Sequence, residues 1–176
     1  MDVMNESDAR DAMDRVRPPS SAAMRKLLAG VALACGVLAA AHAADGHHTA
    51  VPADAVKWGP APASLPAGAQ AAVLLGSPAK EGPFVIRLKL PDGFAVPAHR
   101  HSKDEFLTVI SGRFGVAAGG KLDKEGAVPL PAASFIHLPA GMPHAAWASG
   151  ETVVQINGTG PFDVVYLDPK DDPRKQ

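Results

Sequence analysis

Three residues whose side chains commonly bind metals stand close together in the second half of the chain. His99, His101 and Glu105 lie two and four positions apart. Alternate side chains of a β-strand point to the same face, so a continuous strand would direct all three to one side. Imidazole nitrogen and carboxylate oxygen are usual ligands of first-row divalent metals. The spacing therefore predicts three ligands of one divalent ion, which could be Fe, Mn, Ni, Cu or Zn.

A fourth ligand is expected from residues 139–144. The Pro and Gly residues of this segment predict a turn that places His144 where the next strand begins. The alternative is that these polar residues occupy the solvent face of a two-faced sheet. Leu107 and Val109, however, share the face of Glu105, and a carboxylate on such a face is costly to bury unless it is paired or bound to metal. We therefore expect a metal site made of His99, His101, Glu105 and His144.

Other polar residues are less expected to belong to the metal site. His137, in the strand before the turn, is expected to point outward instead of supporting a ligand. Gln155 and Asn157 share a face of a late strand and are either polar groups of a pocket or, for Asn157, a turn cap before Gly158. Asp163 and the residues that follow Asp168 are interpreted as a solvated C-terminus.

The elements that must position the ligands are short strands. Residues 84–90 alternate apolar with other residues, and turn residues separate the further β-rich runs. No stretch after residue 43 has useful helical periodicity, so an antiparallel all-β domain, closed as a barrel or a double sheet, is predicted. The expected strands are 84–90, 105–110, 114–117, 134–138, 152–157 and 162–167.

The N-terminal part has the pattern of a secretory signal. Residues 24–26 are Met-Arg-Lys, a small apolar run follows, and residues 41–43 are Ala-His-Ala. We expect a leader or mis-assigned start at 1–23, disordered, a signal peptide at 24–43, an extended arm at 44–72, a barrel at 73–168 and a tail at 169–176. The mature protein would then be periplasmic or secreted, without a membrane span. The alternative of lipidation at Cys35 remains open, and Cys35 is the only cysteine, so cleavage after Ala43 would leave no thiol ligand.

Charge and composition exclude one class of partner. The formal net charge is -1, with 20% charged residues, and the chain has no basic excess that would attract a phosphate backbone. Nucleic-acid binding is therefore not expected. Phe106 and Ile110, on the face of their strand opposite Glu105, leave that outer face more apolar than a monomer needs, which predicts a homodimer.

The ligand pattern resembles the cupin superfamily. Its first motif is matched by Gly93, His99, His101, Glu105 and Gly112, and its second by Pro139, Gly141 and His144. The second motif departs at Ala133, where the family has Gly, and at Ala148, where it has Asn. The overall pattern is also similar to the cupin domain associated with anti-sigma factors. The resemblance implies a single jelly-roll β-barrel with a metal on the four ligands.

The function expected from this resemblance is a metal-dependent enzyme acting on a small molecule, with dioxygenase-like chemistry favoured and Glu105 as the base. A non-catalytic module that binds or senses a metal or ligand is the alternative.

Overall fold

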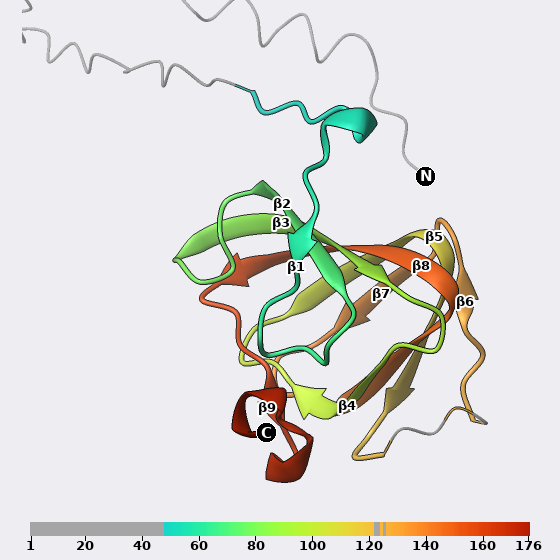
Figure 1. Cartoon of the computed structure of the whole chain (residues 1–176). Helices are drawn as coiled ribbons and strands as arrows, with labels where there is room; N and C mark the ends of the chain where they lie inside the picture. The colour runs from blue at the N-terminus through green and yellow to red at the C-terminus, as the bar shows by residue number, and fades with distance from the viewer. Residues whose placement is uncertain (1–47, 122–123, 125) are drawn as a thin grey trace, which may run out of the picture. The chain divides into compact units, whose positions relative to one another are not determined.

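A computed structural model describes residues 48–121, 124 and 126–176, which form one antiparallel sheet of nine strands (Figure 1). Three short 3-10 helices, at Ala53–Ala55, Pro169–Asp171 and Pro173–Lys175, are the only helices of this part. The all-β prediction is confirmed. The leader and the signal peptide lie outside the described residues. The strands are β1 (Gly59–Pro60), β2 (Gln70–Leu75), β3 (Gly82–Leu90), β4 (Ala95–Arg100), β5 (Glu105–Ala118), β6 (Leu130–Pro131), β7 (Phe135–Leu138), β8 (His144–Gly160) and β9 (Val165–Tyr166).

Two long strands, β5 and β8, organise the sheet. They pair with each other along most of their length, from Phe106 opposite Asn157 to Ala118 opposite His144. The C-terminal half of β8 also pairs with β3, and its N-terminal end pairs with β4. The two ends of one strand therefore belong to different groups of neighbours, so that the sheet curls around its core.

Both long strands bend at glycine. Gly112 of β5 has φ 76° and Gly150 of β8 has φ 76°, a left-handed conformation that favours glycine. A Cβ atom on Gly112 would lie 2.4 Å from the carbonyl oxygen of Glu151. The pairing register shifts at this place, between Ser111 and Arg113. Glycine is thus required where the sheet turns from one group of strands to the other.

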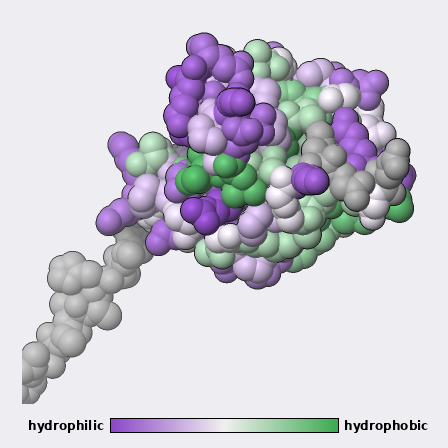
Figure 2. Space-filling view, turned by 90° about the horizontal axis from the view of Figure 1, so that it is seen from below, coloured by the Kyte–Doolittle hydropathy of each residue, from purple (hydrophilic) through white to green (hydrophobic). Residues whose placement is uncertain are grey.

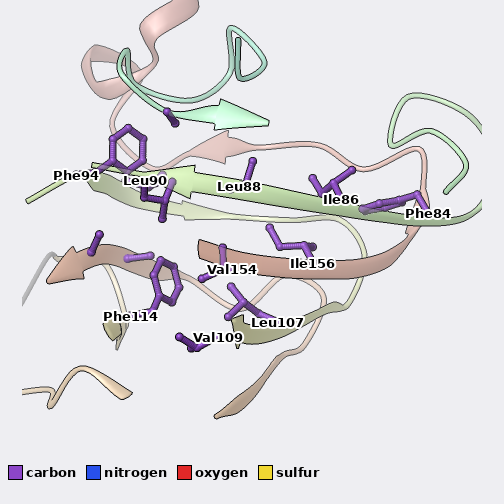
Figure 3. Packing of buried hydrophobic residues seen from close by; sticks show 14 of the residues in the cluster. Phe84, Ile86, Leu88, Leu90, Phe94, Leu107, Val109, Phe114, Val154 and Ile156 are labelled. Atoms are coloured by element: carbon purple, nitrogen blue, oxygen red, sulfur yellow. The ribbon is translucent and has the colours of Figure 1, made fainter. Parts of the chain in front are cut away.

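The core lies between the facing halves of the sheet (Figure 3). Alternating residues of each strand enter it, for example Ile86 and Leu88 of β3, and Val154 and Ile156 of β8. Burial of apolar area is the main favourable term that holds such a sheet closed. One cluster contains residues from both halves, so the barrel interior is a single core.

Trp147 is buried outside that cluster, at 4% exposure. A Cβ atom on Gly115, its neighbour on β5, would lie 2.2 Å from the Trp147 ring. The indole therefore lies directly on the backbone of β5, and Gly115 is what leaves it room.

The observed strands differ from the expected ones mainly in extent. β5 runs unbroken through the two strands expected at 105–110 and 114–117, and β8 begins at His144 instead of residue 152. The run at 162–167 contributes only the two residues of β9. β1 and the first residues of β2 lie within the segment expected as an extended arm. β2 pairs with β3 from Gln70 to Leu75. Part of that arm therefore belongs to the sheet.

The surface of the described part is mixed. Figure 2, a view from below, shows hydrophilic residues interspersed with smaller hydrophobic areas, as is normal for a globular domain. Within residues 48–121, 124 and 126–176, no helix has the length and hydropathy that a membrane span requires.

Candidate metal centre

A bulge in β4 aims the first histidine inward. Val96 pairs with Ala146 and His99 with His144, so three steps along β4 match two along β8. Such a bulge changes which side chains face the interior. As a result Val96 and His99, three residues apart, both line the cavity inside the barrel. His99 and His144 lie directly opposite each other, with ring centroids 4.3 Å apart.

The other two candidates come from separate elements. β4 ends at Arg100 and β5 begins at Glu105, so His101 lies just after one strand and Glu105 opens the next. No continuous strand joins the three residues, although the three do come together. The Glu105 Oε2 atom lies 3.3 Å from His101 Nε2 and 3.8 Å from His144 Nε2.

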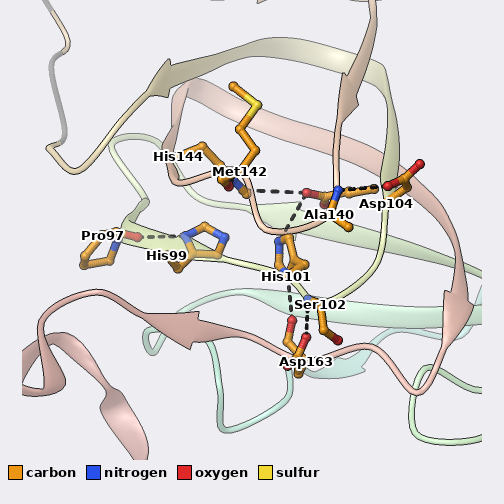
Figure 4. A network of polar contacts seen from close by, with 10 residues as sticks. Pro97, His99, His101, Ser102, Asp104, Ala140, Met142, His144 and Asp163 are labelled. Carbon is orange, nitrogen blue, oxygen red and sulfur yellow. Dashed lines mark hydrogen bonds and ion pairs between the residues drawn. The ribbon is translucent and has the colours of Figure 1, made fainter.

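Each imidazole is oriented by a backbone carbonyl (Figure 4). The Nδ1 atom of His99 lies 2.8 Å from the oxygen of Pro97, that of His101 lies 2.5 Å from Asp163, and that of His144 lies 3.0 Å from Met142. A carbonyl oxygen only accepts, so each Nδ1 must carry the proton and donate it. In the neutral ring this leaves Nε2 with a free lone pair, which is the state that binds a metal.

Burial and charge set the protonation of the site. The three imidazoles and the carboxylate are each at most 6% exposed. Burial, with the charge of His144, lowers the pKa of His99 to about 4. Burial also lowers the pKa of His144. For His101, burial acts downward too, but the hydrogen bond and charge of Glu105 outweigh it and raise its pKa.

Glu105 is the partner in that pair. Burial acts to raise its pKa, but the hydrogen bond and charge of His101 outweigh burial and lower it. His101 and Glu105 thus stabilise the charged form of each other, whereas burial favours the neutral form of His99 and His144.

Backbone and side-chain bonds join the turn before His144 to the loop after His101. The amide of Gly141 donates to the carbonyl of His101 at 2.8 Å. The Asp104 carboxylate accepts from the amide of Ala140 at 2.8 Å and contacts His137 Nε2 at 3.3 Å. The bonds from Gly141 to His101 and from Ala140 to Asp104 fix the distance between the two segments that deliver ligands.

The segment after β8 also supports the site, which the sequence did not indicate. Besides orienting His101 with its carbonyl, Asp163 accepts the amide proton of Ser102 at 2.7 Å through its side chain. Phe162 stacks on the His101 ring, with centroids 4.4 Å apart and 22° between the planes. Asp163 is exposed, as expected of a solvated residue, but its contacts with Ser102 and His101 were not expected. Its partners lie about sixty residues away, so no local pattern could have revealed them.

The remaining candidates lie outside the site. His137 is on the outer surface, stacked against Phe106 with centroids 4.9 Å apart. Gln155 bonds Arg87 and Asn157 on the outer face of the sheet. Neither the pocket role nor the turn-cap role holds for Asn157, which lies inside β8.

The candidate ligands open onto a cavity of about 330 Å³ inside the barrel, near the lower end of the ~300–1,000 Å³ typical of ligand pockets. Its ionisable lining residues are His99, His101, His144 and Glu105, and the rest of the wall is mainly aliphatic or aromatic. Four titratable groups thus converge at one place in an otherwise apolar interior.

The donor set fits a divalent metal. The ligand atoms of His99, His101 and His144 lie within 4.8 Å of one another, and Glu105 contacts two of the three rings. Without an ion, burying three imidazoles and a carboxylate in an apolar cavity has a large desolvation cost. Nitrogen and oxygen donors suit Fe, Mn, Ni, Cu and Zn, so three histidines of the chain can hold a metal of this class.

Comparison with known proteins agrees with this architecture. Residues 86–165 match the family model described as the cupin domain. No curated protein is similar enough in sequence to count as a match.

Solved structures share the fold at low sequence identity. The polyketide cyclase RemF from Streptomyces resistomycificus is 16% identical, with a TM-score of 0.59 over 73% of this chain and 92% of that chain. A putative acetylacetone dioxygenase from Methylibium petroleiphilum is 21% identical, with a TM-score of 0.57 over 73% and 86%. An acetylacetone dioxygenase from Acinetobacter johnsonii is 17% identical, with a TM-score of 0.55 over 72% and 81%. At these identities the likeness concerns the fold alone.

Proposed function

Because this chain belongs to the cupin superfamily, we propose that it is an exported metal-dependent enzyme that acts on a small molecule, with dioxygenase-type chemistry. The observation that carries the proposal is the orientation of the three imidazoles. Each Nδ1 donates to a carbonyl, so three Nε2 lone pairs are presented together. Three imidazoles that present Nε2 to one place when neutral, with a carboxylate beside them at one end of a ligand-sized cavity, form the donor set that a reactive metal centre needs.

In this proposal His99, His101, His144 and Glu105 hold one divalent ion. The ion would supply Lewis-acid or redox chemistry at its open coordination positions. The chain's own residues bind the small molecule in the apolar cavity and exclude water from it. Among the described lining residues, Glu105 is the one ionisable group besides the imidazoles, so its carboxylate is the group that can accept a proton from the bound molecule.

The solved structures named above support this choice of chemistry only by analogy, since a shared fold does not fix a reaction. A non-catalytic binding or sensing module is the second candidate. The observation that favours it is the absence of any acid or base in the described cavity wall beyond the ligand set.

The test is metal content combined with single substitutions. We expect the purified protein to hold close to one divalent ion per chain, and His101→Ala and His144→Ala to lose most of it. His137→Ala is the matched control, because that side chain lies on the outer surface. An unchanged molar ratio of metal in His101→Ala would refute the site. Redox-active Fe, Mn, Ni or Cu would favour the enzyme, and tightly held Zn without open positions would favour the binding module.

Two further parts of the proposal concern the whole chain. Export through residues 24–43 predicts that mature protein from the periplasm begins at Ala44 or Asp45, and intact Met24 on cytoplasmic protein would contradict it. A homodimer is proposed through the outer face of β5 and β7, where Phe106, Ile110 and Phe135 are 40%, 41% and 62% exposed. Burying such a patch is favourable, and a monomeric mass by light scattering at micromolar concentration would contradict it.

A further inference from the structure

We infer that the molecule bound beside the metal is mainly apolar, with a single polar end that reaches the metal and no charge elsewhere, and that it enters beside β2. This inference rests on the proposed metal site for the polar end. It rests on the cavity wall for the apolar part, which the wall defines independently of any metal.

The wall gives no partner to a second charged group. Apart from the candidate ligands, the described lining residues include no Asp, Glu, Lys, Arg or His. A carboxylate, phosphate or ammonium group in this space would lose its hydration without gaining an opposite charge, which is strongly unfavourable. Charged ligands are therefore excluded unless the charge is the end that binds the metal.

The wall is also poor in hydrogen-bonding side chains. Ser64 and Ser77 are its only hydroxyl-bearing residues among those described, and they belong to loops before and after β2. The Ser77 oxygen already accepts the amide proton of Ala79. A sugar or another polyhydroxylated molecule would leave most of its hydroxyl groups unpaired, at a cost for each one. Apolar ligands are the class that this wall accepts.

The entrance is marked by an exposed apolar residue. Val73 of β2 pairs with Ile86 and lines the cavity, yet it is 59% exposed. β1 pairs only with Gln70 and Ala71, so the rest of β2 has an open edge. The side chains of His99, His101 and His144, in contrast to Val73, are at most 6% exposed. An apolar molecule that enters at this edge therefore meets Val73 before it reaches the buried metal ligands.

The test compares three hydroxamates, which chelate metal through two oxygens, on the Zn²⁺-loaded protein. Octanohydroxamate should bind at least 100-fold more tightly than acetohydroxamate, because six more carbons enter an apolar cavity. The octanedioic acid monohydroxamate, which ends in a carboxylate, should lose most of that gain. Equal binding of the acetyl and octanoyl compounds, or full affinity for the carboxylate compound, would overturn the inference.

A second measurement does not need the metal. The neutral fluorophore prodan should bind the metal-free protein, and Val73→Glu should weaken that binding at least tenfold. Val128→Glu is the matched control, since Val128 is 78% exposed and does not line the cavity. Prodan binding without metal retention would refute the metal site and support the apolar cavity. No prodan binding, or equal effects of the two substitutions, would overturn the cavity assignment itself.

Discussion

The protonation of the metal-free site predicts how many protons a metal must displace. A protonated imidazole cannot bind metal, so affinity falls as pH falls. Three ordinary histidines with a pKa of about 6.5 would each be about 0.9 protonated at pH 5.5, and together would release about 2.7 protons. The structure predicts a smaller number.

Each ligand contributes differently to that number. With a pKa of about 4, His99 is only about 0.03 protonated at pH 5.5. His101, whose pKa is raised, contributes nearly one proton, and His144, whose pKa is lowered, contributes less than an ordinary histidine. Glu105, with its lowered pKa, contributes about 0.1 or less. The sum lies between about one and two protons.

The assay is calorimetric titration of the metal-free protein with Zn²⁺ at pH 5.5 in two buffers of different ionisation enthalpy. The difference in apparent enthalpy gives the number of protons released. Zinc-bound water has a pKa of about 7 even in a favourable site, so it adds none at this pH. His137→Ala should give the same number as the parent. A release of about 2.5 protons or more would show that burial does not keep His99 neutral, and would refute the reasoning.

Two substitutions of small residues test the packing and backbone of the barrel by urea denaturation. Gly115→Ala should lower the free energy of unfolding by about 2–3 kcal/mol, because the new Cβ meets the Trp147 ring at 2.2 Å. The control Gly59→Ala should change the free energy of unfolding little, because nothing lies within 4 Å of its new Cβ. Equal effects of the two substitutions would contradict the packing of Trp147 on Gly115. Ala133→Gly should raise the free energy of unfolding by about 0.5–1 kcal/mol, because Ala133 has φ 68° and an L-residue in that region is strained by more than the added chain entropy of glycine costs. A loss of stability in Ala133→Gly would show that the strain is absent.

The ligand residues were predictable because their chemistry is local in sequence. The sequence alone shows two histidines two positions apart, followed by Glu105. It also shows a Pro/Gly turn before His144. The geometry that unites these ligands was not predictable. The bulge in β4 that returns His99 to the face of Val96 contains Pro97, a residue type that occurs at bulges, but it is defined by pairing with a strand more than forty residues away.

The extent of the strands was underestimated for a related reason. Polar and small residues such as Ser111, Gly112 and Gly150 have the composition of turns, and the strands expected from the sequence end at residue 110 and begin at residue 152. In the folded chain these residues are bends within β5 and β8, because pairing of the two strands resumes beyond them and the amide of Gly150 donates to the Asp92 carboxylate. The departure at Ala133 is likewise explained by structure. The backbone keeps the positive φ that suits the family's glycine, although the residue is alanine.

The orientation of the imidazoles by main-chain oxygens has a consequence for how this site tolerates sequence change. A hydrogen bond to a side-chain acceptor is lost when that one residue is substituted. A bond to a backbone carbonyl survives substitution of its residue as long as the backbone keeps its path. Exchanges at Pro97 or Met142 that preserve the local conformation therefore leave the tautomers of His99 and His144 intact. Selection on this centre is thereby concentrated on few positions. The surrounding sequence is free to diverge while the chemistry of the ligands stays the same.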